Sequence, residues 1–319
     1  MKFATLCLWL LSAFHAWAAP LPSATEDSEE CEPPAAVIRS PESVIRVGYT
    51  PFGLMIDERL MLNSLKSTLT PEKLGHPVTF RQYSAHDLAK AVRAGEVDIV
   101  FSESPFYQAL ISEGLRSVTT FVCDVQPDPN RNDGTAVIVR SDSLAKTFED
   151  LRGKKLTAVS RDTFSGYLYA IRELVQRKLG DPDHFFSKQT FVADRTQSDV
   201  NEHVFNDVVG GKSDVGFLPL CALEEMSRRD PSILSKVRVV EERLTDTVTD
   251  CRHSTPLYPA LTLSVTPRIS ASMSKAITMD LLMLPKGENG FMWSVASDFQ
   301  SANNVLLSLI HISEPTRPY

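Results

Sequence analysis

The sequence predicts an α/β protein of two similar lobes, each a mainly parallel sheet flanked by helices. Short apolar segments with strand character alternate with segments whose apolar residues recur at helical spacing, the pattern of parallel α/β units. The pattern restarts near residue 151, and one phrase occurs twice, at 95–98 and at 211–214. In each copy a helix ends at Gly and an Asp then enters a buried strand. Two lobes are therefore expected, not one long sheet.

Bulk composition sets the class of protein. The chain has 319 residues, 43% of them hydrophobic and 23% charged, which suits a soluble globular protein with ample core. Its net charge of -7, without a run of Lys or Arg, provides no electrostatic footprint for nucleic acid or for a membrane surface. A small anion would have to bind through local donors.

The N-terminus predicts export. Met1 to Ala18 combine a positive start at Lys2, a short apolar run and an Ala-Trp-Ala cleavage site, the pattern of a secretory signal peptide. No later stretch approaches ~18 uninterrupted apolar residues, so the exported chain is expected to be soluble. Residues 19–43 are rich in Pro and acidic side chains, which predicts a flexible leader.

The first lobe is predicted over 44–140 plus a return at 250–309. A capping sequence at 84–87 opens one of its helices, and Gly95 ends that helix. Apolar runs bounded by turn residues mark its strands. The expected strands lie at 44–49, 78–83, 97–101, 117–123, 135–140 and 260–265, and the expected helices near 60–69, 84–95, 102–111, 268–283 and 298–309.

The second lobe is predicted over 141–249. Two chain crossovers should then join the lobes, with a cleft between them at the carboxyl ends of the strands, where ligands bind in such architectures. The expected strands lie at 156–159, 189–193, 215–218 and 236–240, and the expected helices near 166–179, 199–209 and 220–228.

A polar turn between the strand at 156–159 and the next helix is the main candidate site. Thr163, Ser165 and Gly166 leave the first helical N–H groups pointing out of the sheet, where the helix dipole favours an anion. The alternative is an ordinary N-cap, in which these hydroxyls bond the N–H groups of their own helix.

Three residues of the first lobe are candidates for the opposite wall of the cleft. Tyr107 and Ser102 follow the central strand and would face the turn, although a core position for Tyr107 and simple capping are equally compatible with the pattern. Tyr49 ends the first strand and is either a cleft wall or a packed aromatic.

The cysteines predict disulfides and no metal site. Without Cys7 of the signal peptide, Cys31, Cys123, Cys221 and Cys251 remain, which allows two disulfides in three connectivities. A Cys221–Cys251 pair near the hinge is read first as structural, and alternatively as a redox-active pair. The cysteine spacing is not that of a zinc site, and hydrolase and nucleotide-binding motifs are absent, so neither a cofactor nor an enzyme is expected.

Four stretches carry a family resemblance: 162–167, 214–224, 253–259 and 293–300. They resemble periplasmic binding proteins of the phosphonate/phosphite family, and more closely the sensing domain of tetrathionate-sensor-type histidine kinases. The resemblance implies a type II periplasmic-binding (Venus-flytrap) fold that captures a small oxyanion. It also implies a membrane partner, either an ABC permease or a transmembrane kinase segment of the same protein.

Two departures from the family's pattern, and the end of the chain, qualify the resemblance. The sensor family usually carries a Trp soon after the Leu-Tyr-Pro motif, and here Ala260 and Leu261 follow Pro259. Asn201 and Glu202 stand where phosphonate binders usually carry a His-Asp pair, so Asn201 becomes the candidate there and phosphonate itself is not the expected ligand. Residues 310–319 resemble a translated sequencing-adapter tail, which would place the natural continuation of the chain after Leu309. A function of a different class stays open, namely a periplasmic thiol-disulfide redox protein acting through Cys221 and Cys251.

Overall fold

A computed structural model describes residues 43–50, 58–124, 126–193, 200–243, 251–287 and 290–299, with backbone only for 58–61. The predicted signal peptide, the leader up to residue 42 and the adapter-like tail lie outside these residues, as does nearly all of the predicted helix at 298–309. Within them, no helix combines the length and apolarity that a membrane span requires.

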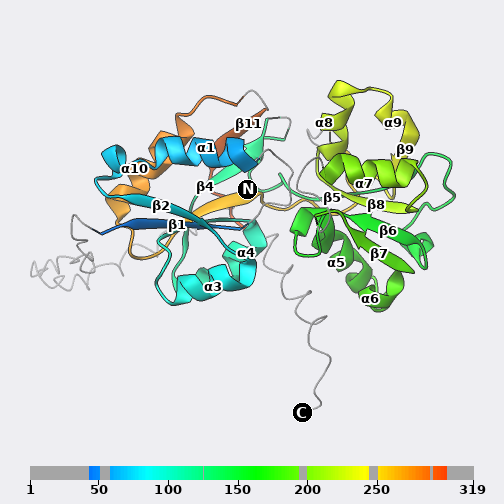
Figure 1. Cartoon of the computed structure of the whole chain (residues 1–319), viewed down its shortest axis with the longest axis horizontal. Coiled ribbons are helices and arrows are strands. Elements are labelled where there is room, and N and C mark those ends of the chain that lie inside the picture. Colours follow the sequence, from blue (N-terminus) through cyan, green and yellow to red (C-terminus); the bar gives the residue numbers. More distant parts are fainter. Residues whose placement is uncertain are drawn as a thin grey trace, which may run out of the picture. The chain divides into compact units, whose positions relative to one another are not determined.

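The first sheet has six strands in the order β11-β4-β10-β3-β1-β2. Helices cover both of its faces (Figure 1), because apolar stripes of α1 and α10 meet one core cluster and those of α3 and α4 meet another. The strands are β1 (Ile45–Tyr49), β2 (Val78–Gln82), β3 (Ile99–Ser102), β4 (Arg116–Cys123), β10 (Leu261–Val265) and β11 (Phe291–Val295). The helices are α1 (Glu58–Thr68), α2 (Pro71–Leu74), α3 (Ala85–Arg93), α4 (Ser104–Ala109), η1 (Ile111–Glu113) and α10 (Ala271–Leu282).

The second sheet has five strands in the order β7-β6-β8-β5-β9. Its helices again lie on both faces, with α5 and α6 over one core cluster and α7, α8 and α9 over the other (Figure 1). The strands are β5 (Thr135–Arg140), β6 (Lys155–Ala158), β7 (Lys188–Phe191), β8 (Val215–Pro219) and β9 (Val237–Val239). The helices are η2 (Glu149–Leu151), η3 (Phe164–Leu168), α5 (Tyr169–Gln176), α6 (Pro182–Phe185), α7 (Val200–Val209), α8 (Ala222–Arg229) and α9 (Ile233–Lys236).

The two-lobed α/β architecture is confirmed, but the sheets are mixed and not mainly parallel. β1 runs parallel to β2 and β3, and β6 runs parallel to β7 and β8. Every pair made by β10, β11, β5 and β9 is antiparallel. The spacing of hydrophobic residues indicates that a strand is buried. It does not indicate whether the strand runs parallel or antiparallel to its neighbours, because that depends on which strands it pairs with.

The lobe boundary also differs from the prediction. The strand at 135–140, expected in the first lobe, is β5 and pairs with β8 and β9 of the second sheet. The first crossover therefore lies between Cys123 and Thr135. β11, at Phe291–Val295, was not predicted as a strand, and it pairs with the outer side of β4.

The repeated phrase has the same structural role in both lobes. Asp98 N–H donates to the Arg46 carbonyl at 2.8 Å, and the Asp98 carboxylate accepts from Arg46 N–H at 2.9 Å. Asp214 N–H donates to the Lys155 carbonyl at 2.9 Å, and its carboxylate accepts from Lys155 N–H at 2.8 Å. Each Asp thus fastens its strand to the start of the neighbouring parallel strand.

Candidate functional site

The two crossovers between the lobes are bonded to each other. Asp133 N–H donates to the Tyr258 carbonyl at 2.9 Å, and Tyr258 N–H donates to the Asp133 carbonyl at 2.8 Å. Nearby, the Thr255 hydroxyl accepts from Thr135 N–H at 2.9 Å, and the Ser254 hydroxyl accepts from Val137 N–H at 3.0 Å. Residues 253–259, which lead back to the first lobe, are therefore hydrogen-bonded to β5.

The predicted polar turn follows β6 and enters a π-helical turn, η3, which continues directly into α5. A side chain at Gly166 would place its Cβ 2.6 Å from Thr163 Oγ1 and 2.8 Å from Val159 Cβ, so only glycine permits this tight turn. Thr163 Oγ1 donates to the Ser160 carbonyl at 3.1 Å and does not cap the helix that follows. Single π-helical turns are frequent at functional sites.

A carboxyl group of the first lobe occupies the N–H groups of this turn. Phe164 N–H donates to Glu103 Oε1 at 3.0 Å, and Ser165 N–H also bonds the Glu103 carboxylate. Glu103 lies between β3 and α4, so this contact joins the two lobes. The donors expected from the sequence are therefore present, but their partner is an internal acid that sequence reasoning missed. The available signal was an acidic residue directly after the buried strand β3.

A second carboxyl group, that of Asp133, lies beside the first. Its Oδ1 accepts from Gly134 N–H at 2.9 Å, its Oδ2 accepts from the Tyr169 hydroxyl at 3.3 Å, and the Ser165 hydroxyl bonds it as well. Burial raises the pKa of Asp133 to about 7. Burial, and then the charge of Asp133, raise the pKa of Glu103 to about 8. Because desolvation disfavours the charged form, this pair retains protons near neutral pH.

Two stacked tyrosines both bond Asp133, Tyr169 through its hydroxyl and Tyr258 through its backbone. The rings of Tyr169 and Tyr258 stack with centroids 4.2 Å apart and an interplanar angle of 17°. Arg172 Nη1 donates to the Tyr258 hydroxyl at 2.7 Å, and burial raises the pKa of Tyr258 to about 12. The pKa of Tyr169 is also raised by burial, well above its usual value. The two lobes contact each other through Glu103 and the turn at Phe164. The cleft between the lobes therefore remains a prediction.

The other predicted ligand residues do not gather at the turn. Tyr107 lies in the core, where its hydroxyl accepts from Ser117 N–H at 3.3 Å and its ring lies 4.5 Å from that of Phe299. Tyr49 is partly buried and packs against the core of the first sheet. For both, the packing alternative describes the position. Ser102 is fully buried at the end of β3, next to Glu103.

Asn201 lies in the first turn of α7, in the second lobe. The segment that leads into this helix, 194–199, lies outside the described residues. The predicted ligand-binding roles remain predictions for Thr163, Ser165, Gly166, Tyr107, Ser102, Tyr49 and Asn201.

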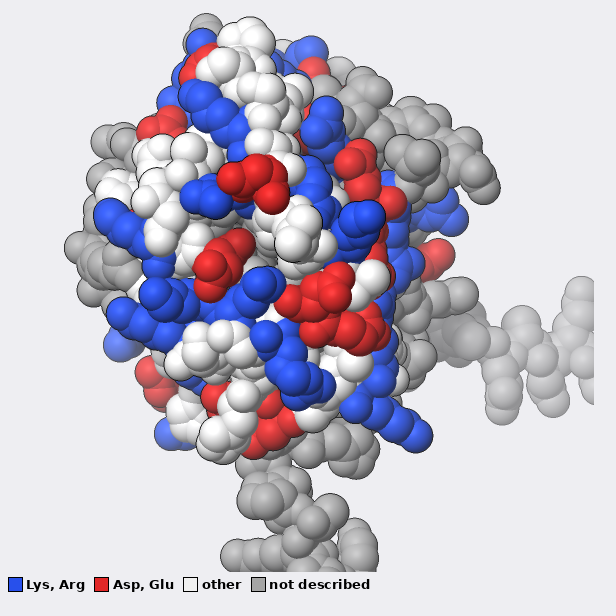
Figure 2. Space-filling view, turned by 90° about the vertical axis from the view of Figure 1, so that its right-hand side faces the viewer, with Lys and Arg blue, Asp and Glu red and all other residues white. Residues whose placement is uncertain are grey.

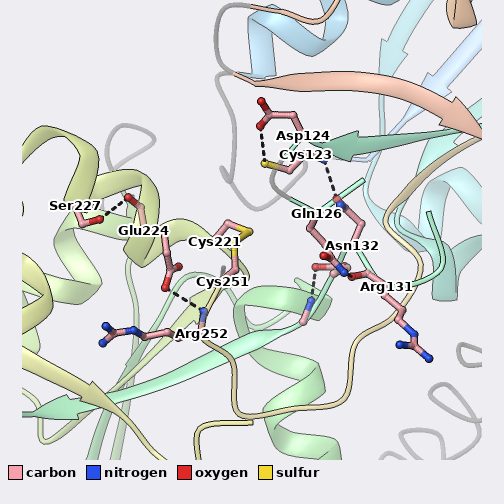
Figure 3. The surroundings of a disulfide bond; sticks show 12 residues. Cys123, Asp124, Gln126, Arg131, Asn132, Cys221, Glu224, Ser227, Cys251 and Arg252 are labelled. Carbon is pink, nitrogen blue, oxygen red and sulfur yellow. Dashed lines mark hydrogen bonds between the residues drawn. A yellow bond between two sulfur atoms is a disulfide. The ribbon is translucent and has the colours of Figure 1, made fainter. Parts of the chain in front are cut away.

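The structure contains the Cys221–Cys251 disulfide, with its sulfurs 2.02 Å apart (Figure 3). It joins the start of α8 to the returning crossover, where the Glu224 carboxylate also accepts from Arg252 N–H at 3.0 Å. Cys123 lies apart from it, buried at the end of β4, with its thiol 3.9 Å from the Asp124 carboxylate. Cys31 lies outside the described residues, so a Cys31–Cys123 pair stays open.

A separate polar pocket of about 340 Å³ lies where β6 and β7 begin, because Lys155 and Lys188, the first residues of these strands, line it. The candidate turn lies at the other end of β6. It is lined by Lys155, Lys188, Thr190, Asp207, Lys212 and Ser213. On the side of the molecule shown in Figure 2, basic and acidic side chains alternate and neither forms a continuous patch. Among the described residues, no group of three or more His, Cys, Asp or Glu could hold a metal ion.

Two α/β lobes joined by bonded crossovers are the architecture of the type II periplasmic binding proteins. Residues 62–301 match the family described as "ABC transporter, phosphonate, periplasmic substrate-binding protein", and the chain belongs to this family. The family is of a substrate-binding, non-catalytic type, and its location is periplasmic.

Individual relatives are distant. The chain is 24% identical over 245 residues to the tetrathionate sensor histidine kinase TtrS of Salmonella typhimurium, a match that covers 76% of this chain and 40% of that protein. It thus spans well under half the length of this curated relative.

Solved structures share the fold. XAC2383 from Xanthomonas citri, bound to chloride, has a TM-score of 0.60 at 16% identity, covering 86% of this chain and 99% of that one. PhnD1 from Prochlorococcus marinus, in complex with methylphosphonate, has a TM-score of 0.56 at 16% identity, covering 85% of this chain and 99% of that one.

Proposed function

We propose that this protein captures a small oxyanion between its lobes, at the N-terminal turn formed by Phe164, Ser165 and Gly166. The observation that carries the proposal is that the N–H groups of Phe164 and Ser165 point out of the second lobe toward the first and bind a carboxyl group there. A site that holds a carboxyl oxygen on helix N–H groups has the chemistry to hold an oxygen of a phosphonate, a phosphate or a sulfur oxyanion.

The surrounding groups suit such a ligand. The hydroxyls of Ser165 and Tyr169 already bond a carboxyl oxygen, that of Asp133, and would act equally well on an oxyanion. A protonated Asp133 can also donate a hydrogen bond. The names of relatives point to the same chemical class, since one is in complex with methylphosphonate and another senses tetrathionate.

The bonded crossovers suit capture by lobe closure. Asp133 and Tyr258 form a short two-chain hinge, and the Cys221–Cys251 disulfide fixes the returning chain to the second lobe. A solute that contacts both lobes favours the closed state by its differential affinity for that state. The partner that reads closure is proposed to be an ABC permease or a membrane-spanning kinase segment, and export is proposed to follow from the signal peptide at Met1 to Ala18.

A thermal-shift screen of the purified protein tests this function. The panel holds tetrathionate, thiosulfate, sulfite, phosphate, phosphite and methylphosphonate, each titrated to saturation. We expect saturable stabilisation by one oxyanion, lost in Ser165→Ala and retained in Lys188→Ala, which alters the distant lysine pocket. No stabilisation by any member would refute the oxyanion site. Loss only in Lys188→Ala would move the site to the lysine pocket.

A redox function is the second candidate, because the Cys221–Cys251 disulfide is present and Cys221 is only partly buried. Its thiolate would lie at the N-terminus of α8, where the helix dipole stabilises negative charge. The same screen on reduced protein separates the two functions. Stabilisation by tetrathionate that requires both cysteines, and not Ser165, would favour redox chemistry.

A further inference from the structure

Glu103 holds a position that its own helix does not explain. Its backbone stands at the N-cap of α4 in the first lobe, yet its side chain makes no capping bond to that helix. The carboxyl group reaches instead to the second lobe, where it accepts from Phe164 N–H at 3.0 Å and from Ser165 N–H. It therefore caps η3 across the lobe junction, in the place where an external anion would bind.

The groups around Glu103 keep its own carboxyl group in the protonated, uncharged form. Asp133 approaches from the crossover, Asp162 from the turn ahead of η3, and Tyr169 from α5 faces the same acid pair. Glu103 is only 9% exposed, and burial together with Asp133 raises its pKa to about 8. At neutral pH two N–H groups thus hold a mostly uncharged carboxyl group, and an ionised oxyanion would accept stronger, charge-assisted hydrogen bonds from the same two donors.

Two buried polar atoms lie in the residues that directly precede Glu103 and Asp133 in the chain. Ser102 Oγ and Asn132 Nδ2 have no hydrogen-bond partner among the described residues. Ser102 is 0% exposed and Asn132 7% exposed, and they directly precede Glu103 and Asp133. Buried polar groups are nearly always paired, so these two atoms are exceptions in the segments that carry the acid pair.

We propose that Glu103 is a built-in occupant of the oxyanion site, which joins the lobes in the absence of solute and which an external oxyanion displaces from Phe164 and Ser165. This inference rests on the proposed function and adds its regulation. Displacement moves Glu103 from a buried, mostly protonated state into water, where a carboxyl group ionises at its usual pKa. Binding of the anion therefore releases a proton at neutral pH. We call the contact of Glu103 with Phe164 and Ser165 the latch. It weakens the apparent affinity, because a molecule whose two N–H groups hold Glu103 cannot bind the anion there.

Affinity and proton release test the displacement. Calorimetric titrations with methylphosphonate and with tetrathionate compare the protein with Glu103→Ala and with Glu96→Ala, a matched removal of an exposed glutamate in the same lobe. At pH 7 we expect Glu103→Ala to bind about tenfold more tightly or better, the effect of removing two competing hydrogen bonds, and Glu96→Ala to be unchanged. Repeating the titration in two buffers of different ionisation enthalpy should show release of nearly one proton, reduced in Glu103→Ala. Equal or weaker binding by Glu103→Ala would overturn the proposal.

The latch also has a test that needs no ligand. Small-angle X-ray scattering of ligand-free protein should give a larger radius of gyration for Glu103→Ala than for the unchanged protein and for Glu96→Ala. Identical scattering from all three, with unchanged affinities, would refute the latch while leaving the oxyanion site intact. If no anion in either titration binds any form, the proposed function fails, and the scattering comparison alone decides whether Glu103 holds the lobes together.

Discussion

Replacing Glu103 by glutamine should change how the stability of the protein depends on pH. The usual pKa of a glutamate is 4.5 and that of Glu103 in the folded protein is about 8, because the carboxyl group is buried beside Asp133. Between these values the folded state binds more protons than the unfolded state. The free energy of unfolding contributed by Glu103 is therefore largest below pH 4.5 and falls as pH rises toward 8.

The size of the effect follows from the two pKa values. At 1.36 kcal/mol per pH unit, the full gap corresponds to roughly 5 kcal/mol, of which about 3–4 kcal/mol falls between pH 5 and pH 8. Glu103→Gln keeps the shape and a carbonyl acceptor but cannot ionise, so this loss should disappear. Asp133, with its pKa raised to about 7, continues to contribute in both proteins.

Urea denaturation at pH 5, 6, 7 and 8 measures the difference. Trp293, which is buried in the first sheet and is the only tryptophan after the predicted signal peptide, reports unfolding by fluorescence. We expect the free energy of unfolding of Glu103→Gln to exceed that of the unchanged protein by a margin that grows with pH. Glu96→Gln, an exposed change of equal charge in the same lobe, is the control. Parallel stability curves for Glu103→Gln and the unchanged protein would refute the burial argument.

Three further changes test the packing that positions the site. Gly166→Ala should cost about 1–3 kcal/mol by urea denaturation, because its Cβ would lie 2.6 Å from Thr163 Oγ1; an unchanged midpoint would show that the turn relaxes freely. Replacing both Cys221 and Cys251 by serine should lower stability by about 2–4 kcal/mol, since the disulfide closes a loop with a sequence separation of 30, and reduction should have the same effect on the unchanged protein. Asp98→Ala should cost more than Asp214→Ala in the same assay, since Asp98 is fully buried and pairs with Arg46 and with Arg268 at 2.8 Å, whereas Asp214 is exposed. Equal losses in the two Asp variants would contradict that ranking.

Local chemistry explains most of what could be predicted. Helical spacing, the capping sequence at 84–87 and the apolar runs located every described strand except β11, and every described α-helix of six or more residues, within a few residues. These signals act between neighbours in the chain. The helices of three or four residues were not predicted. The repeated Gly-to-Asp phrase predicted two lobes. In each lobe the Asp of the phrase bonds the first residues of the neighbouring parallel strand. The Cys221–Cys251 bond was a preferred pairing, and the structure contains it.

Contacts between distant segments account for what was missed. The direction of β10 and β11, and the membership of β5 in the second sheet, depend on partners that no local signal identifies. The sequence shows that Tyr107 follows a buried strand, but not which way its ring points. In the folded protein the ring packs into the core of the first lobe.

The candidate site shows the same division. From the sequence alone came the strand-to-helix turn at 163–166 and its free N–H donors, because a helix start has unpaired donors wherever it occurs. Only the tertiary structure decided that Glu103 of the other lobe meets those donors and that Asp133 lies beside it. The raised pKa values of both acids depend on burial, and that of Glu103 depends also on the charge of Asp133. Neither the burial nor the approach of Asp133 to Glu103 can be read from neighbours in the chain.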